Sequence, residues 1–242
     1  MSVFRFKRFE VVNERSAMKV NTDGVLLGAA MTILPSDGFL LDIGTGTGTI
    51  ALMAAQRLSE ISSGDAVIDA IDIDEPSASE AAANFAASPW SQSLSAHHSS
   101  LDEFVADNNT KYDLIFSNPP YFEDSLIAPD ARKSTARHTS VGLSYRDIFE
   151  FARTHLAECG RVSLVLPSDL ENDLTRYARM SGLHLFRIMR IRTVPRKSPS
   201  RIIAEFSFER PVQLFEELLT IQDEGKYTQE YLSLTRDFYL FA

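Results

Sequence analysis

The sequence predicts an α/β fold: a mostly parallel, seven-stranded sheet with helices on both faces. Apolar runs of strand length alternate with helix-like stretches from about residue 39 onward. Such alternation produces right-handed βαβ units, and these units build a parallel sheet. The last two apolar runs, 184–194 and 201–209, follow one another without a helix. We therefore expect the last strand to pair antiparallel.

The first half of this pattern contains two strands and two helices. "GFLLDIG" (38–44) is a short apolar run typical of a buried strand, and "GTIALMAAQRLSE" (48–60) has apolar residues at helical spacing. "DAVIDAIDID" (65–74) predicts the next strand. The Ala-rich stretch 75–88 predicts a helix, with Pro76 near its start, where proline is tolerated.

The remaining elements continue the alternation. Two more strands are expected at "SLSAHHSS" (93–100), which is the weaker of the two, and at "YDLIFSN" (112–118). After a long polar loop, the chain continues with a helix, a strand and a helix at 145–158, 160–167 and 169–182. Ahead of the first strand, "GVLLGAAM" begins a helix that Asn21 or Thr22 would cap.

The composition favours one domain in a reducing compartment. The chain has 242 residues, 44% of them hydrophobic, which is enough for one sizeable core. It contains no apolar run long enough to cross a membrane, and its N-terminus lacks the apolar segment of a signal peptide. Cys159 is the only cysteine and makes no internal disulfide. We therefore expect a cytoplasmic protein.

The charge argues against a protein that coats nucleic acid without specificity. The net charge is −9, and polyanions are repelled by such a surface as a whole. Two local segments are nevertheless basic: residues 1–19, with five Lys or Arg against two Glu, and residues 187–201, with six Lys or Arg and no acid. A solvated face is the simplest interpretation of such segments.

A glycine-rich loop joins the first predicted strand to the helix at 48–60. In "LDIGTGTGTI", Gly44, Gly46 and Gly48 alternate two residues after Asp42. A dinucleotide loop would have its third glycine where this chain has Thr49. Alternating glycines let the backbone approach a ligand closely, and the upstream acid suits a ligand that carries a cation rather than a pyrophosphate. The alternative, an ordinary Gly-rich turn, is disfavoured because open sheets bind ligands at such junctions.

An acidic residue is expected at the end of the second strand, where it can bind ribose hydroxyls. "IDAIDID" supplies Asp72 at the strand end, with Asp69 and Asp74 nearby. Asp72 fits the carboxyl edge of the sheet best. Asp74 has a structural alternative as the cap of the next helix.

The fourth strand ends in a rigid turn, "SNPPYF". Pro119 and Pro120 offer no backbone N–H, and each restricts the residue before it. The turn therefore fixes Asn118 and presents Tyr121 and the residue after it at the strand end. The alternative is a rigid apolar turn with no chemical role. The glycine loop at a neighbouring strand end favours the catalytic interpretation, because function is argued from the whole site.

These motifs resemble a known family. "DIGTGTG" followed by "NPPYF" resembles the Rossmann-like class I S-adenosylmethionine-dependent methyltransferases that modify exocyclic amino groups. Four further stretches resemble the bacterial adenine-N6 methyltransferases that act on valine tRNA, and they are spread from one end of the chain to the other: residues 4–30, 84–90, 136–149 and 227–240. The Asn-Pro-Pro-Tyr motif alone is less specific, because DNA, ribosomal RNA and protein glutamine-N5 methyltransferases share it.

The resemblance implies one methyltransferase domain over 1–242. Residues 1–36 would form a segment that gates substrate and cofactor, and residues 37–242 the Rossmann-like core and C-terminal tail. S-adenosylmethionine would be the cofactor. Its contacts would come from the strand ends and from "KVNTDG": Asp42, Gly44, Thr45, Gly46, Gly48, Asp72, Ile73, Ser100, Leu101, Thr22 and Asp23. Relatives commonly carry an acid at the position of Ser100, where it accepts from the amino group of the cofactor adenine. In this chain the nearest acid after Ser100 is Asp102.

The resemblance also implies a chemical role for the proline turn. An adenine amino nitrogen is a poor nucleophile because its lone pair is delocalised into the ring. The side-chain carbonyl of Asn118 and the backbone carbonyl of Pro119 would accept its hydrogens, with Pro120 locking the turn, because such a site needs preorganised dipoles. Tyr121 would stack on the target base. No strong general base is required, because the proton leaves after transfer.

RNA is the substrate that the sequence favours. Protein glutamine-N5 enzymes usually carry a helical domain before the glycine loop, and DNA adenine enzymes a recognition domain after the catalytic turn; this chain has room for neither. We expect phosphate and base contacts from the following residues: Phe122, Lys7, Arg8, Lys19, Arg132, Lys133, Arg137, His138, Arg196 and Lys197.

Other functions remain open on the sequence alone. A ribosomal RNA amino methyltransferase or a protein glutamine-N5 methyltransferase would use the same turn, and a non-catalytic RNA-binding domain is a more distant alternative. No Cys, His and acid cluster has metal-ligand spacing, so no metal is expected and the histidines are interpreted as structural or surface residues. The sequence indicates no obligate protein partner.

Overall fold

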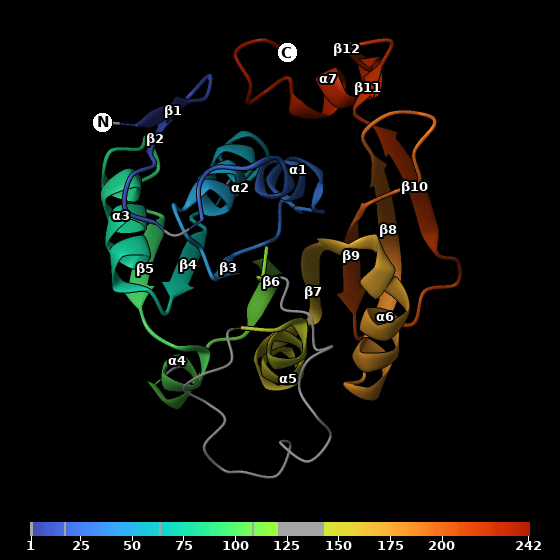
Figure 1. Ribbon diagram of the computed structural model, residues 1–242. Coiled ribbons are helices and arrows are strands. Elements are labelled where there is room, and N and C mark those ends of the chain that lie inside the picture. Colours follow the sequence, from blue (N-terminus) through green and yellow to red (C-terminus); the bar gives the residue numbers. More distant parts are fainter. Residues whose placement is uncertain (1, 17, 63, 108, 121–142) are drawn as a thin grey trace, which may run out of the picture.

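The central feature is an eight-stranded sheet in the order β10-β8-β9-β7-β6-β3-β4-β5 (Figure 1). The computed structural model describes residues 2–16, 18–62, 64–107, 109–120 and 143–242. In sheet order the strands are Phe215–Thr220, His184–Arg192, Arg201–Ser207, Leu156–Pro167, Tyr112–Ser117, Phe39–Ile43, Val67–Asp72 and Leu94–His98.

The pairing confirms the predicted topology. All neighbouring strands are parallel except β9, which pairs antiparallel with both β7 and β8. The seven predicted strands are all present, and β3 lies between β4 and β6. The carboxyl ends of these parallel strands therefore meet at one edge, where α/β sheets bind ligands.

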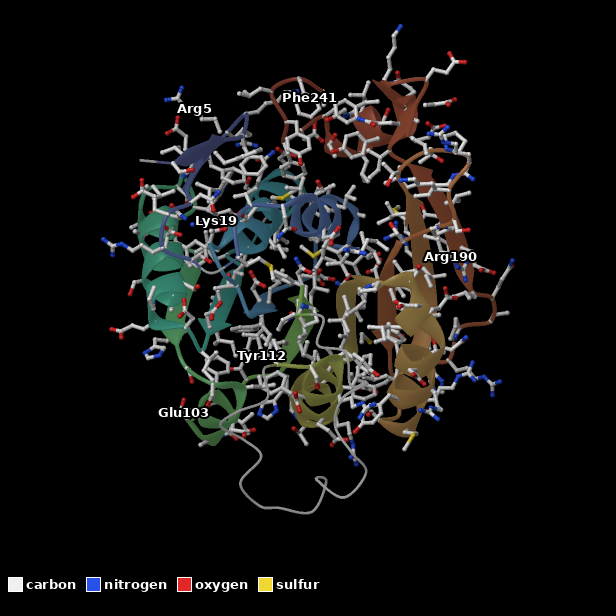
Figure 2. All side chains as sticks on the ribbon, in the orientation of Figure 1. Arg5, Lys19, Glu103, Tyr112, Arg190 and Phe241 are labelled. Atoms are coloured by element: carbon white, nitrogen blue, oxygen red, sulfur yellow. The ribbon has the colours of Figure 1, made fainter. Side chains whose placement is uncertain are left out.

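The count of seven strands was wrong by one, because β10 adds an edge strand next to β8. Its sequence, "FEELLT", contains two glutamates, and Glu is depleted in strands. Glu216 pairs with Arg190 of β8, and Glu217 with Arg187, both at 2.7 Å. Figure 2 shows Arg190 at this side of the molecule. These cross-strand ion pairs offset the weak strand propensity of the glutamates.

Two apolar cores cover the two faces of the sheet. Helices α1 (Thr22–Ala30), α2 (Thr49–Ile61) and α3 (Glu75–Ala86) bury their apolar residues in one core. Helices α5 (Tyr145–His155) and α6 (Glu171–Met180) bury theirs in the other, with α4 (Leu101–Asp107) packed at its margin. Figure 1 shows α1 and α2 on the opposite side of the central strands from α5.

Three of the helices that cover the sheet, α1, α3 and α5, begin at capping side chains. Asn21 caps α1 by accepting from the backbone N–H of Gly24 at 2.8 Å. Asp74 caps α3, and Pro76 stands in its first turn. Ser144 forms a capping box with Asp147 at the start of α5. Each side chain satisfies a backbone donor that has no partner within its helix.

The two ends of the chain pack together, which the sequence did not predict. An N-terminal hairpin, β1 (Val3–Arg5) and β2 (Glu10–Val12), lies beside α3 (Figure 1). The C-terminal part contains β11 (Gln222–Asp223), β12 (Lys226–Tyr227) and α7 (Gln229–Thr235). Elsewhere in the chain, a 3₁₀ turn (Ser168–Leu170) connects β7 to α6. Lys7 N–H donates to the Phe238 carbonyl at 2.8 Å, which joins the two ends. No described helix is both long and apolar enough to cross a bilayer.

Candidate functional site

The candidate site is the edge of the sheet where β3, β4 and β6 end. The glycine loop follows β3, Asp72 ends β4, and Asn118 follows β6. Because β3 pairs in parallel with both other strands, these three motifs are adjacent. The sequence prediction that the fourth strand ends beside the first is confirmed.

The glycine loop requires glycine for two different reasons. Gly44, Gly46 and Gly48 all have positive φ, at 72°, 58° and 80°, which L side chains rarely adopt. A Cβ on Gly48 would also lie 2.4 Å from Cε1 of Phe85 in α3, so this position has no room for a side chain. Gly48 is the N-cap of α2. The end of the glycine loop is therefore packed against α3, and the loop leads directly into the first turn of α2.

Asp42 lies buried under this loop with half of its carboxylate unsatisfied. Its Oδ2 accepts from the Thr45 hydroxyl at 2.7 Å. Its Oδ1 is buried and has no hydrogen-bond partner within the described parts of the chain. Burial raises the pKa of Asp42 to about 7, and the nearby charge of Asp72 adds to the shift. The Thr45 hydroxyl and, more weakly, the Ala51 backbone N–H oppose it. A cationic group placed here would stabilise the ionised carboxylate.

Asp72 connects the second strand to the glycine loop. Its Oδ2 accepts from the Gly46 backbone N–H at 2.8 Å, and its Oδ1 from the Asp74 N–H at 2.9 Å. Burial raises the pKa of Asp72, although these two N–H donors oppose the shift. Ile73, the next residue, is 68% exposed. The end of β4 therefore presents a carboxylate that is fixed by two backbone N–H groups, next to the exposed side chain of Ile73.

Asn118 is buried at the end of β6 and is tied to the same edge. It is 7% exposed. Ser117, the residue before it, donates its hydroxyl to the Ile43 carbonyl at 2.6 Å, which fixes the end of β6 to the start of the glycine loop. The Asn118 amide Nδ2 lies 3.6 Å from the Met18 sulfur. Pro119 and Pro120 follow directly. The turn is therefore positioned by both the sheet and the N-terminal segment.

Three of the other four predicted cofactor contacts, Ser100, Leu101 and Asp23, have structural partners in the described chain. Ser100 and Glu103 cap the start of α4 reciprocally, with 2.8 Å between the hydroxyl and the carboxylate. Leu101 packs against the second core. Thr22 is exposed at the start of α1, and Asp23 pairs with Arg201 at 2.7 Å.

The basic residues predicted to contact RNA fall into three groups. Lys7, Arg8 and Lys19 have partners within the chain: the carbonyls of Arg236 and Ala242, the Glu60 carboxylate, and the carbonyls of Asn13 and Glu14. Arg196 and Lys197 are exposed in the loop after β8. The remaining predicted residues of the catalytic turn and the following loop lie outside the described residues: Tyr121, Phe122, Arg132, Lys133, Arg137 and His138.

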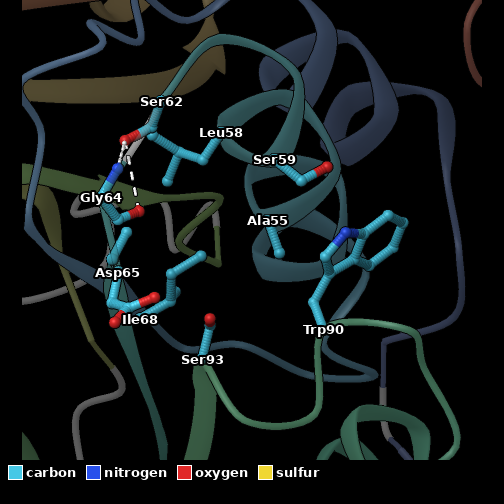
Figure 3. A pocket seen from close by; sticks show the side chains of 10 residues that line it. Ala55, Leu58, Ser59, Ser62, Gly64, Asp65, Ile68, Trp90 and Ser93 are labelled. Atoms are coloured by element: carbon cyan, nitrogen blue, oxygen red, sulfur yellow. Dashed lines mark hydrogen bonds between the residues drawn. The ribbon is translucent and has the colours of Figure 1, made fainter.

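A small pocket of about 150 Å³ lies elsewhere (Figure 3). It is lined by the C-terminal end of α2, by Ala66 and Ile68 at the start of β4, and by Trp90. Because β4 begins here and ends at the glycine loop, this pocket belongs to the opposite edge of the sheet. The described residues contain no group of three His, Cys, Asp or Glu side chains placed to hold a metal ion.

Sequence reasoning missed three polar residues that hold the site together: Ser117, Glu80 and Asn84. Asn84 Nδ2 donates to the carbonyls of Thr47 in the glycine loop and Val12 in β2. Glu80 and Asn84 are nearly fully buried on α3. A buried polar stripe on an Ala-rich helix is the signal that would have identified the last two, because buried polar groups need partners.

Comparison with known proteins places this arrangement in a family. The profile of the family "Methyltransferase small domain" matches residues 16–175. A tRNA1(Val) (adenine(37)-N6)-methyltransferase from Parabacteroides distasonis is 41% identical over 238 residues, which cover 98% of this chain and 97% of that protein. A protein of the same name from Flavobacterium johnsoniae is 37% identical over 239 residues, covering 98% and 99%.

Solved structures show the same fold at low identity. A predicted O-methyltransferase from Agrobacterium tumefaciens has a TM-score of 0.61 and 15% identity, and the match covers 89% of this chain and 96% of that one. The 16S rRNA N2 G1207 methyltransferase of T. thermophilus, in complex with AdoMet and guanosine, has a TM-score of 0.56 and 19% identity, covering 86% and 50%. The chain therefore belongs to the methyltransferase small domain family and, within it, to the family of the tRNA1(Val) (adenine(37)-N6)-methyltransferases.

Proposed function

We propose that this protein transfers a methyl group from S-adenosylmethionine to the N6 amino group of an adenine beside the anticodon of a valine tRNA. The observation that carries the proposal is the placement of Asn118 beside the glycine loop, at adjacent strand ends of one sheet. The proposal is supported by the 41% and 37% identical relatives, whose names state adenine 37 of a valine tRNA and which match nearly the whole chain.

The residues at the strand ends fit the cofactor. S-adenosylmethionine is the methyl donor of the family and supplies an electrophilic methyl group on a sulfonium. The buried Oδ1 of Asp42, which has no partner among the described residues, suits its cationic amino group. Asp72 and the exposed Ile73 suit a ribose and the face of an adenine. Thr45 is held by its hydrogen bond to Asp42. The three glycines around it have left-handed backbones and no Cβ, so the cofactor can approach the backbone of the loop closely.

The proline turn would orient the target amino group. The carbonyls of Asn118 and Pro119 accept its two hydrogens, which favours a pyramidal nitrogen whose lone pair is free to attack. Asn118 is buried, so these dipoles act in a medium of low dielectric constant, where they are stronger than in water. Ser117 holds the turn to Ile43 and so fixes its distance from the glycine loop. Catalysis by this arrangement is largely positioning.

We extend the proposal to the parts of the chain that bind RNA. Residues 1–36 gate the cofactor and substrate, and residues 37–242 form the Rossmann-like core and tail of a single domain. Tyr121 and Phe122 stack on the target base. Arg196 and Lys197 contact phosphates, with the four basic residues between 132 and 138. A tRNA substrate also implies a cytoplasmic location, and a loop adenine is less costly to extrude than one in a duplex.

A transfer assay separates this function from its neighbours. The protein is incubated with S-adenosylmethionine carrying a labelled methyl group, together with total RNA and total protein from cells that lack the gene. We expect label in the small-RNA fraction, as N6-methyladenine. Label in ribosomal RNA or in protein glutamine would replace the proposed substrate, and no label in any fraction would contradict enzymatic activity.

A further inference from the structure

Glu80 of α3 holds the segment that crosses the glycine loop. We define the N-terminal strap as residues 13–16 and 18–20. The Glu80 carboxylate accepts three backbone N–H groups of the strap, from Glu14 at 2.8 Å and from Arg15 and Ser16 at 2.9 Å. The side chain is 4% exposed. Three successive backbone donors around one buried carboxylate form a strong, directional anchor, because each bond is charge-assisted.

The same helix holds the glycine loop. Asn84 lies one turn after Glu80, and its Nδ2 donates to the Thr47 carbonyl at 2.9 Å. It also bonds both backbone groups of Val12, just before the strap, at 2.9 and 3.0 Å. Ser77, on the same stripe, donates its hydroxyl to the Asp74 carboxylate at 2.6 Å, and its oxygen lies 3.1 Å from the Ser16 hydroxyl. The stripe Ser77, Glu80 and Asn84 therefore fixes the strap and the loop relative to one another.

The anchored part of the strap leads directly to the reacting groups. The Ser16 hydroxyl and the Met18 carbonyl lie 3.4 and 3.6 Å from the position that a Cβ on Gly46 would take. The Met18 sulfur lies 3.6 Å from the Asn118 amide nitrogen. Lys19 closes the strap on itself by donating to the carbonyls of Asn13 and Glu14. A strap that shifted at Ser16 would shift at both the glycine loop and Asn118.

We propose that Glu80 is a positioning residue of the methyl transfer: by anchoring the N-terminal strap on α3, it holds Met18 against Asn118 and the cofactor loop. The inference rests on the proposed function for the identity of the cofactor. A purely local structural role would stabilise the strap without changing cofactor affinity. The positioning role changes affinity and strap protection together.

Glutamine at position 80 distinguishes the two roles. Gln has nearly the volume of Glu, and its carbonyl still accepts from Glu14 and Arg15. Its amide group would face the Ser16 N–H, however, and two donors then oppose one another. Packing is kept while the contact nearest the glycine loop is lost. Glu75→Gln is the matched control, because Glu75 lies on the same helix but is exposed.

The experiment measures S-adenosylmethionine affinity by calorimetry and the rate of tryptic cleavage after Arg15 and Lys19, both exposed residues of the strap. We expect Glu80→Ala to lose about tenfold or more in affinity, the equivalent of one charge-assisted hydrogen bond. Glu80→Gln should lose a smaller factor, and cleavage in the strap should accelerate in both variants. Glu75→Gln should match the wild type.

Two results would overturn the inference. One is wild-type affinity for S-adenosylmethionine in both Glu80→Ala and Glu80→Gln, whether or not cleavage of the strap accelerates, because a purely structural anchor gives that result. The other is faster cleavage at every tryptic site, including Arg196 far along the chain, which indicates loss of the fold rather than release of the strap. If the wild type itself fails to bind S-adenosylmethionine, the proposed function fails, while the rate of strap cleavage still decides whether Glu80 anchors it.

Discussion

Asp42 links the protonation of one buried carboxyl to the stability of the fold and, in the proposed function, to cofactor binding. Its pKa is about 7 in the folded chain, against an ordinary value of 3.8, because it is buried. The folded state therefore binds this proton more tightly than the unfolded state does. As the pH rises from about 4 to about 7, Asp42 ionises first in the unfolded chain, so the folded state loses stability, and the deficit stays constant above that range.

Asp42→Asn should accordingly stabilise the protein at pH 8 and weaken cofactor binding. The gain in unfolding free energy is at most about 4 kcal/mol, since each pKa unit is worth about 1.4 kcal/mol, and it should vanish below about pH 4. Wild-type affinity for S-adenosylmethionine should rise between about pH 5.5 and about pH 7.5 as Asp42 ionises, while the variant should show no such rise. Thermal denaturation and calorimetry across pH check both effects.

The exposed Asp65 provides the control for these measurements. Asp65→Asn should follow the wild type in both pH profiles. A wild-type affinity that does not change over this pH range would contradict the pairing of Asp42 with a cation.

Asn118→Ala tests the amino-acceptor role of the catalytic turn. We expect methyl transfer to fall by about 10²–10³-fold, comparable to the loss of one preorganised dipole in other active sites. Cofactor affinity should stay within a few-fold of the wild type, because Asp42 and the glycine loop are unchanged. Single-turnover rates and calorimetry measure the two quantities. Asn172→Ala, an exposed change on α6, should alter neither, and normal turnover by Asn118→Ala would refute the mechanism.

At the scale of elements, the site depends on how α3 packs against the loop that begins α2. Gly48 has a φ of 80°, and a Cβ there would meet Phe85 at 2.4 Å. Gly182, after α6, has the same φ of 80°, but a Cβ added there would have nothing within 4 Å among the described residues. An alanine at Gly182 would therefore suffer backbone strain alone, whereas an alanine at Gly48 would suffer the same strain and a steric clash as well.

Gly48→Ala should destabilise the protein more than Gly182→Ala. A left-handed backbone costs an alanine about 1–2 kcal/mol at either position, and overpacking at Gly48 adds about 1–3 kcal/mol. Cofactor affinity should fall only in Gly48→Ala, because Phe85 is buried and a shift of the glycine loop would relieve the contact. Chemical denaturation and calorimetry provide the comparison. Equal destabilisation by the two substitutions would show that contact with Phe85 is unimportant.

At the scale of the whole molecule, strong local patterns made the fold predictable. The alternation of strands and helices predicted the parallel sheet, and the absence of a helix between 194 and 201 predicted the antiparallel β9. The edge strand β10 was missed because its partners lie on β8, about thirty residues earlier in the chain: a parallel ladder and two ion pairs that no local pattern reveals. Tertiary context of this kind overrides propensity.

The candidate site was predictable to the same extent. Asp42, the three glycines, Asp72 and Asn118 lie at or just after the carboxyl ends of neighbouring strands, so topology alone brings them together. The polar stripe on α3 marks Glu80 as a residue that needs partners, but which backbone groups it binds was not predictable, because they lie more than sixty residues away in the chain. Local sequence also could not show that Lys7 and Lys19 bind backbone carbonyls within the chain.

The central claim concerns the reaction and the substrate together, so one measurement tests both. An unmodified transcript of valine tRNA is incubated with the protein and S-adenosylmethionine, digested, and analysed by mass spectrometry. A second transcript carries guanine in place of the adenine beside the anticodon. We predict one N6-methyladenine at that position in the first transcript and none in the second. Methylation at any other position, or equal methylation of both transcripts, would contradict the claim.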